Sequence, residues 1–379
     1  LIDQIWKRRK NIKSSAKKQE IKFAGVKSKS KIDQILKIIK RNNAEALFIP
    51  QPENVCWTLN IRGEDLEHTP ILRGCLLIDK SKNLMLFSDS ITNHSQLKSW
   101  LGKNIDVYKT KEFENVIKRQ NYQKIQFDPN YTTQSQASSL IKYSNSFICL
   151  SDPITLMKAC KNNAEINGSR KAHLVDGIAL TKFIHWLENE IDGTKNNHTE
   201  ISLARKLLHF RKRNKDFKGL SFGTISSLGS NGAVIHYQPE KETDKYLSDN
   251  DIYLLDSGGQ YKFGTTDVTR TILNKRDKKP KDFNEISNNY TLVLKGHIAV
   301  ARSHFKKGET GKNLDSKARK FLIKNGLNYD HGTGHGVGSY LGVHEGPQSI
   351  SPKSSAPLLE GMIISCLLYT SDAADELRS

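Results

Sequence analysis

The spacing of apolar residues predicts alternating helices and strands over residues 28–150. In residues 32–39, isoleucines and a leucine recur at the spacing of one helical face, and Ser28 or Ser30 before them suits a helix N-cap. Short strands are predicted by compact apolar runs bounded by turn residues, at 46–49, 75–78, 84–87 and 125–127. The polar segment KSKN between the second and third runs predicts a hairpin, and the alternation as a whole predicts a small α/β domain.

A second set of elements is predicted after Pro153. A long helix is indicated by apolar residues near one face, Leu174, Ile178, Phe183, Leu187 and Ile191, with Gly193 as its stop. Strands are predicted at 252–255 and 268–272, and helices at 291–305 and 314–324. We expect no regular structure at 331–338, because half of that run is glycine.

Length and composition narrow the class of protein. The chain has 379 residues, of which 36% are hydrophobic and 26% charged, so we expect two or three folded domains rather than a disordered chain. No apolar run approaches the roughly 20 residues that span a bilayer. The first ten residues lack the apolar stretch of a secretory signal, and the absence of an initiator methionine indicates that the natural start lies upstream.

The charge balance is strongly basic, with a formal net charge of +19. The excess consists of 44 lysines and 15 arginines, and the lysines are spread over the whole chain without interleaved aromatics. Nucleic-acid readers favour arginine for its planar fork, so we expect no nucleic-acid partner and no membrane partner. A basic nucleic-acid binder is the alternative, and salt-sensitive retention on DNA would favour it.

The cysteine pattern indicates a reducing compartment. There are five cysteines, an odd number, and no two of them form a C-x-x-C pair. Buried thiols are therefore expected, rather than a disulfide framework or a zinc ribbon, and we expect a cytoplasmic location.

Two aspartates stand where the predicted strands of the second half meet. Asp256 ends the first strand and Asp267 begins the second, with a glycine-rich turn between them. A hairpin would bring both carboxylates to one end of a sheet, where they repel each other unless a cation or a proton intervenes. Oxygen ligands suit a hard divalent metal such as Mn, Mg or Zn. Two aspartates in a solvated turn are the alternative.

Four histidines accompany this pair. His331, His335 and His344 lie in or near the glycine-rich run, and His236 precedes the first aspartate strand. Neutral imidazole is the commonest transition-metal ligand and a frequent acid or base near pH 7. We expect the other eight histidines to be structural or exposed: His68, His94, His173, His185, His198, His209, His297 and His304.

Five segments resemble aminopeptidase P, the Xaa-Pro aminopeptidase of the pita-bread metallopeptidase family. Three carry the candidate site: LLDSGGQYKFGTTDVTRT, HGTGHGVGSYLGVHEGP and SNGAVIHYQP. LNIRGEDLEHTP resembles the middle domain of the long three-domain form, and KACKNNAEINGSRKAH the start of its catalytic domain. The resemblance implies a creatinase N-terminal-like α/β domain at 28–152 and a pita-bread catalytic domain at 153–365. Residues 1–27 would then be a remnant of an upstream domain and linker.

The resemblance also implies an activity and a site. Asp256, Asp267 and His335 match three of the five metal ligands of the family, and His236, His331 and His344 match its active-site histidines. In the family two divalent ions, usually Mn and alternatively Zn or Co, share a hydroxide that attacks the scissile carbonyl. The substrates are peptides with proline second, from which the first residue is released. The intact form is expected to be a homodimer.

The resemblance stops at Ser365. The family continues there with Asn-Glu-Pro-Gly, whereas this chain reads CLLYTSDAADELRS, so the fourth ligand, a Glu, aligns with Leu367. The fifth ligand, also a Glu, would lie beyond the last residue. We therefore expect 366–379 to be a non-native tail, the catalytic domain to lack its last strands, and the chain as written to have little or no peptidase activity.

Three alternatives remain at this point. The first is a non-catalytic pita-bread protein that binds peptides or proteins. The second is another enzyme of the same fold: cleavage of Xaa-Pro dipeptides alone would mark a prolidase, and methionine aminopeptidase shares the metal site. The third is creatinase, which lacks the metal ligands and is therefore disfavoured by Asp256 and Asp267.

Overall fold

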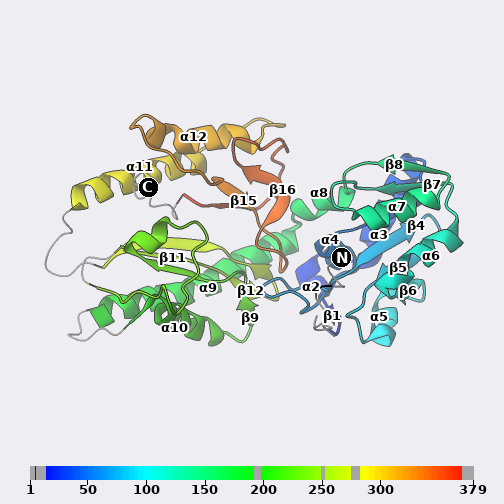
Figure 1. Ribbon diagram of the computed structural model, residues 1–379, viewed down its shortest axis with the longest axis horizontal. Coiled ribbons are helices and arrows are strands. Elements are labelled where there is room, and N and C mark those ends of the chain that lie inside the picture. The colour runs from blue at the N-terminus through cyan, green and yellow to red at the C-terminus, as the bar shows by residue number, and fades with distance from the viewer. Residues whose placement is uncertain (1–4, 6–13, 192–197, 249–251, 275–281, 369–379) are drawn as a thin grey trace. The chain divides into compact units, whose positions relative to one another are not determined.

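The computed structural model describes residues 5, 14–191, 198–248, 252–274 and 282–368 (Figure 1). Contacts divide the chain into two compact units, residues 1–158 and 159–379. Each unit has apolar clusters of its own.

The first unit contains a six-stranded sheet in the order β6-β5-β4-β2-β7-β8. Its strands are β2 (Ala46–Ile49), β4 (Cys75–Asp79), β5 (Leu84–Phe87), β6 (Ile105–Tyr108), β7 (Lys124–Phe127) and β8 (Ser146–Cys149). The predicted hairpin is confirmed, because β4 and β5 pair antiparallel, and β2 pairs antiparallel with β4 and parallel with β7. The predicted α/β character of this region is therefore correct.

Helices accompany this sheet along the chain. They are α2 (Ile21–Ala24), α3 (Ser28–Arg41), α4 (Pro52–Leu59), α5 (His94–Leu101), α6 (Phe113–Gln120), α7 (Gln134–Lys142) and α8 (Pro153–Ala159). The predicted N-cap of α3 was wrong: the cap is Lys27, whose side chain makes no capping bond, and Ser28 is already helical. Two short strands, β1 (Lys17–Lys18) and β3 (Ile61–Arg62), pair antiparallel.

The core of the first unit is apolar and aromatic. Phe113 packs edge-on against Phe48 and Phe87, with ring centroids 5.3 and 4.9 Å apart. One lysine is buried beside α4. The Lys31 amine donates to the Trp57 carbonyl at 2.8 Å and lies 3.7 Å from the centre of its ring. An aromatic face attracts a cation electrostatically, so the buried Lys31 amine has a favourable partner although it is removed from water.

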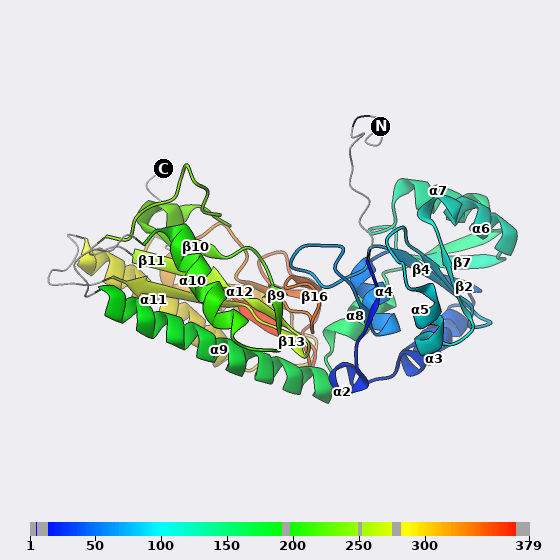
Figure 2. The same ribbon diagram turned by 90° about the horizontal axis from the view of Figure 1, so that it is seen from below.

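The first sheet of the second unit consists of β10 (Ile225–Leu228), β11 (Ile252–Ser257) and β14 (Val268–Leu273). Helices α9 (Asn163–Ile191) and α10 (Glu200–Lys212) pack against it through one apolar cluster (Figure 2). The predicted apolar face of α9 is correct for Phe183 and Leu187, which are buried. It is wrong for Leu174 and Ile178, which are 66% and 50% exposed. The side chain of Ile191, and Gly193, lie outside the described residues.

The second sheet consists of β16 (Glu345–Ile350), β15 (Gly334–Gly336) and β17 (Ile364–Cys366). In Figure 1 the strands of this unit lie between α9 and α10 on one side and α11 (Phe283–Ala301) and α12 (Gly311–Ile323) on the other. The predicted start of α11 was eight residues too late, because its first two turns are polar. A third sheet joins β13 (Gly264–Thr265), β12 (Gly259–Tyr261) and β9 (Phe217–Leu220).

The strand β15 contradicts the prediction that 331–338 lacks regular structure. A Cβ at Gly334 would lie 2.3 Å from the Ser365 carbonyl oxygen, and one at Gly336 would lie 2.2 Å from that of Glu345. These glycines therefore allow β17 and β16 to approach β15 closely, and the composition that argued against a strand makes this one possible.

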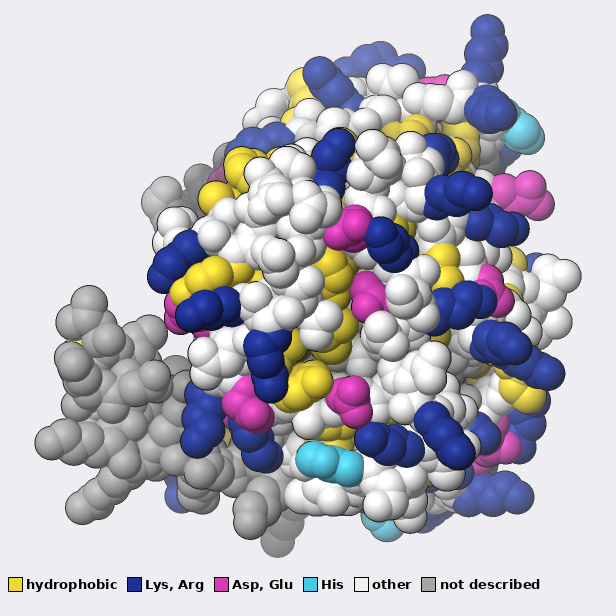
Figure 3. Space-filling model, turned by 90° about the vertical axis from the view of Figure 1, so that its right-hand side faces the viewer, with side chains coloured by type: hydrophobic (Ala, Val, Ile, Leu, Met, Phe, Trp, Pro, Cys, Tyr) yellow, Lys and Arg dark blue, Asp and Glu magenta, His cyan; other side chains and the backbone are white. Residues whose placement is uncertain are grey.

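The surface and the helices agree with two sequence observations. No helix within the described ranges is long and apolar enough to cross a membrane. On the face drawn in Figure 3, Lys and Arg side chains are dispersed among acidic and uncharged ones and do not form one continuous stripe.

Candidate active site

The two aspartates meet at one end of the β10-β11-β14 sheet. Strands β11 and β14 pair antiparallel, with Asp256 opposite Thr269 and Ser257 opposite Val268, so Asp267 lies just before the paired end. Both carboxylates are largely buried, Asp256 with 9% of the residue exposed and Asp267 with 6% of its side chain. The Thr269 hydroxyl donates to Oδ1 of Asp256 at 2.7 Å. The hairpin predicted from the spacing is present.

His335 reaches this pair from the other sheet. It is the middle residue of β15, and its Nε2 lies 3.2 Å from Oδ2 of Asp267. Burial alone would lower the pKa of His335, but the bonds to Asp267 and to the Gly336 carbonyl and the charges of both aspartates together raise it. Three segments of two separate sheets thus bring three candidate ligands together.

The electrostatics of the cluster show why it favours a positive charge. Burial, then the negative charge of Asp267, raises the pKa of Asp256 to about 7. Two carboxylates in a poorly hydrated site cannot both ionise without a compensating cation or proton. In this structure His335 supplies part of that compensation through its contact with Asp267.

His344 and His236 adjoin the cluster. The ring of His344 packs edge-on against that of His335, with centroids 4.2 Å apart. Burial, then the neighbouring His335, lowers the pKa of His344, and His236 acts in the same direction. His236 lies in an exposed loop and has a positive φ of 58°, which is uncommon for a residue with a side chain.

His331 is placed differently from the other predicted site residues. Its ring packs on Tyr329 at 4.7 Å between centroids, and its Nδ1 lies 2.8 Å from the Gly332 carbonyl oxygen. Its own carbonyl accepts a bond from the Arg319 guanidinium. Within the described part of the chain, these contacts join His331 to the α12 side of the unit and not to the aspartates.

A cavity of about 280 Å³ adjoins Asp267. Its walls come from α9, β14, α11 and β17, and they include two histidines that the sequence reasoning set aside, His173 and His297. Burial lowers the pKa of His297. Neither adjoins the other candidate residues in the sequence, although His173 ends the segment KACKNNAEINGSRKAH. Only the packing of α9 and α11 therefore places them beside Asp267.

A buried ion pair supports the end of β11. Arg211 of α10 and Asp176 of α9 are fully buried and joined by two bonds of 2.8 Å. The same guanidinium donates to the Ser257 hydroxyl at 3.1 Å, and the Tyr261 hydroxyl donates to Asp176 at 2.7 Å. Because Ser257 follows Asp256, this network holds the backbone that carries the first candidate ligand.

Equivalent pairs support the second sheet. Asp315 accepts bonds from Arg319 at 2.9 Å and from the Thr333 hydroxyl at 2.6 Å, and Thr333 directly precedes β15. Lys161 donates to Glu345, the residue after His344, and both side chains are almost fully buried. Directional contacts therefore hold both segments that carry the candidate histidines.

The donor set is incomplete for a two-metal centre. Among the described residues, no group of three or more His, Cys, Asp or Glu side chains is arranged to hold a metal ion. Leu367 follows β17 and lies beside the start of β15, because its N–H donates to the Thr333 carbonyl at 2.8 Å. Its side chain offers no ligand atom. The residues that the structure describes therefore do not fit a centre for two ions.

Comparison with known proteins adds the family context. Residues 167–372 match the metallopeptidase family M24, and residues 7–165 match the Creatinase/Prolidase N-terminal domain. The chain is 38% identical over 346 residues to Xaa-Pro aminopeptidase 1 of Dictyostelium discoideum, covering 89% of this chain and 53% of that protein. It is 36% identical over 359 residues to a Sordaria macrospora protein named "Probable Xaa-Pro aminopeptidase P", covering 91% and 57%.

A solved structure is also similar. The X-prolyl aminopeptidase of Caenorhabditis elegans, described as a cytosolic enzyme with a di-nuclear active site, superposes with a TM-score of 0.86 at 32% identity, covering 96% of this chain and 59% of that one. The chain thus spans about half the length of the relatives it matches. Along the sequence, a creatinase-type N-terminal domain is followed by a domain of the pita-bread fold, and the chain belongs to the metallopeptidase family M24.

Proposed function

We propose that the whole protein is an Xaa-Pro aminopeptidase, which releases the first residue from peptides with proline second. The observation that carries this proposal is the convergence of Asp256, Asp267 and His335 from two sheets, with Asp267 lining a cavity. The relatives named Xaa-Pro aminopeptidase support the substrate class.

Six residues would serve the reaction. Asp256, Asp267 and His335 are proposed metal ligands, with manganese as the expected ion. His344, whose ring lies against His335, would contact the substrate together with the exposed His236. His331 would contribute less directly, since its ring packs on Tyr329.

The chain as printed is proposed to be impaired. Divalent ions need several carboxylates to balance their charge, and Leu367, after β17, offers none. The competing function is a pita-bread module that binds peptides without cleaving them. Retention of both aspartates and all four histidines favours an enzyme, and the leucine favours the module.

One substitution separates these readings. Leu367→Glu adds a carboxylate at a position whose backbone is already held by Thr333. We expect it to raise the affinity for Mn²⁺, measured by calorimetry, by about tenfold or more. Release of the first residue from a tripeptide with proline second should rise with it.

Ser355→Glu is the matched control, because it adds the same charge at an exposed position. It should leave Mn²⁺ affinity unchanged, and Asp267→Asn in the Leu367→Glu background should abolish the gain. Equal Mn²⁺ affinity in the original chain and in both glutamate variants would contradict the ligand assignment. Cleavage of Xaa-Pro dipeptides alone would indicate a prolidase.

We further propose a homodimer and a cytoplasmic location for the intact protein, the latter supported by the cytosolic description of the Caenorhabditis elegans enzyme. The domain boundary is proposed at 152–153, where β8 has ended at Cys149 and α8 begins at Pro153. Sedimentation of the full-length protein and limited proteolysis would test these points.

A further inference from the structure

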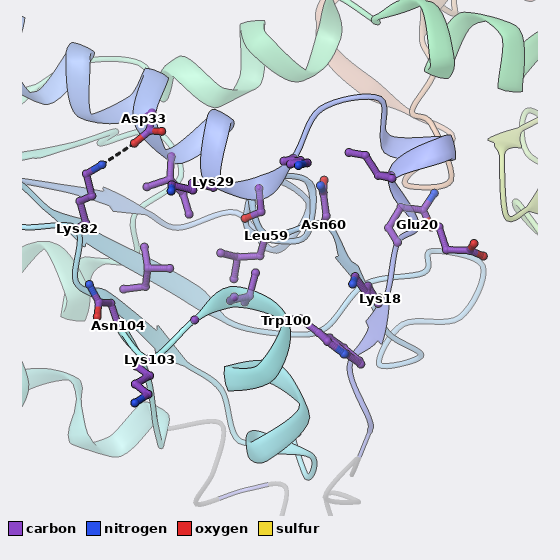
Figure 4. A pocket seen from close by; sticks show the side chains of 18 residues that line it. Lys18, Glu20, Lys29, Asp33, Leu59, Asn60, Lys82, Trp100, Lys103 and Asn104 are labelled. Carbon is purple, nitrogen blue, oxygen red and sulfur yellow. Dashed lines mark hydrogen bonds and ion pairs between the residues drawn. The ribbon is translucent and has the colours of Figure 1, made fainter.

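A larger cavity lies within the first unit. Its volume is about 760 Å³ (Figure 4). Its lining comes from five places: β1 with the segment that joins it to α2, the start of α3, the end of α4, the turn between β4 and β5 with the start of β5, and the end of α5 with the residues after it. None of the proposed catalytic residues belongs to it. It is therefore a separate feature, and the peptidase proposal does not explain it.

The lining is unusually rich in lysine. Five of its eighteen residues are lysines, Lys18, Lys27, Lys29, Lys82 and Lys103, whereas Lys and Arg together supply 59 of the 379 residues of the chain. Two acids also line it, and both are in ion pairs: Asp33 with Lys82 at 2.8 Å and Glu20 with Lys22 at 2.7 Å. Within the described residues, no acid pairs with Lys27, Lys29 or Lys103.

The floor of the cavity is apolar. Ile32, Leu59 and Leu84 are buried beneath it, and Trp100 and Leu101 are half-buried at its side. Figure 4 shows Leu59 between labelled lysines from opposite parts of the lining. An apolar floor with a positive rim favours a ligand that combines negative charge with an apolar group.

The start of α3 also offers hydrogen-bond donors to an anionic ligand. The hydroxyl oxygen of Ser28 is buried and has no partner among the described residues. Ser28 is the first residue of α3, and the cap residue Lys27 makes no side-chain bond to the helix start. The first N–H groups of a helix and its dipole favour an anion. A carboxylate at this end of the cavity would meet both requirements.

The arrangement of charge selects the class of anion. Compact phosphate sites gather donors around one point and often use the arginine fork, but this lining contains no arginine. Its lysines come from β1, from the start of α3, from the turn between β4 and β5, and from the residues after α5. Charges spread in this way suit carboxylates that are distributed along a chain.

We propose that this cavity binds an extended acidic peptide segment that carries a large apolar side chain. The carboxylates would pair with Lys29, Lys103 and their neighbours, and the apolar side chain would lie on the floor beside Trp100. This surface would recruit an acidic protein partner independently of peptide cleavage.

Fluorescence anisotropy of a dye-labelled peptide, acetyl-Glu-Asp-Glu-Phe-Glu-Asp-Glu, tests the proposal at about 50 mM NaCl, where surface charges are weakly screened. We expect the peptide to bind the chain saturably. The double variant Lys29→Glu/Lys103→Glu should bind it with about tenfold lower affinity. Lys111→Glu/Lys118→Glu is the matched control, because it changes net charge equally at exposed positions outside the cavity, and it should lose less than about threefold.

Two matched peptides test the separate requirements. Replacing Phe by Ala should weaken binding by about fivefold, and replacing every acid by its amide should abolish it. If both double lysine variants lose the same affinity for the peptide, general attraction to a basic protein explains the binding, and the proposal is overturned. Equal affinity of the Ala peptide would also overturn it, as would equally tight competition by ATP.

Crosslinking tests the proposal on the unaltered chain, so its result does not depend on whether a variant folds. With benzoylphenylalanine in place of Phe, the peptide should attach to residues 59, 84 or 100–104 after illumination. Attachment spread over other parts of the chain would overturn the proposal.

Discussion

The sheets of the two units are supported in different ways. The main core of the first unit consists of apolar and aromatic side chains packed against a six-stranded sheet. In the second unit the sheets have three strands each, and buried Arg–Asp and Lys–Glu pairs lie beside the strand ends. Apolar burial has no direction, whereas a paired guanidinium fixes the position of the group it contacts.

The difference follows from what each sheet must do. The strands of the first unit need only pack, so hydrophobic side chains of suitable size are sufficient. The strands of the second unit must hold Asp256 and His335 in register across separate sheets. We infer that the buried pairs are retained for positioning rather than for stability, since buried ion pairs contribute little net free energy.

Breaking one of these pairs should produce the largest effect. Arg211→Met would leave the fully buried Asp176 without its partner and lower the free energy of opening of the second unit by about 3–5 kcal/mol. Hydrogen exchange followed by mass spectrometry should show faster exchange in β11 and unchanged exchange in β4.

A neutral control separates the charge from the cavity. Arg211→Met combined with Asp176→Asn removes the unpaired charge and keeps an acceptor for the Tyr261 hydroxyl, so most of the loss should be recovered. If the double variant is as unstable as the single one, packing rather than charge explains the effect.

A core substitution in the first unit should rank second. Leu77 is fully buried and stands opposite Phe48 and Met85 in the sheet. Leu77→Ala should cost about 3 kcal/mol through the cavity it leaves, whereas Leu77→Met should cost less than about 1.5 kcal/mol. Exchange in β2, β4 and β5 reports the change, and a loss of similar size in both variants would show that volume is not decisive.

A buried acid of the first unit, Asp152, should have a smaller effect. Burial raises the pKa of Asp152 to about 6, against the Asn54 bond that lowers it, with Asp128 raising it and Lys158 lowering it. The folded state thus holds this proton more tightly than the unfolded state, so its contribution is complete below about pH 4 and is lost as pH rises through about 6.

Asp152→Asn tests this contribution. The decline in stability of the first unit between about pH 4 and 6, on the order of 3 kcal/mol, should be absent from the variant. Urea unfolding at a series of pH values measures it. Parallel curves for the variant and the original chain would assign the decline to other groups.

The sequence predicted the elements that depend on local pattern. Four strands of the first sheet follow from compact apolar runs, and the Asp256–Asp267 hairpin follows from spacing and glycine. What failed depends on tertiary contacts. Leu174 and Ile178 fit the apolar period of a helix yet are exposed, and β15 forms because neighbouring carbonyls need the space that glycine leaves.

The site shows the same division. Asp267 and His335 were named in advance and lie 3.2 Å apart. His173 and His297 were missed because neither adjoins the other candidate residues in the sequence, and only the packing of helices α9 and α11 brings them to the cavity beside Asp267. The ion pair between Arg211 and Asp176 could not be predicted either, because the two residues lie far apart in the sequence.

The buried amines of Lys31 and Lys161 can report the opening of the two units separately. Within the described ranges the buried lysines are Lys31, Lys158 and Lys161, in a chain of 44 lysines. An amine-acylating reagent will therefore modify the many exposed lysines at once, but Lys31 only after the first unit opens and Lys161 only after the second unit opens. Timed acylation of a single sample would thus record how often each unit opens, without any mutation.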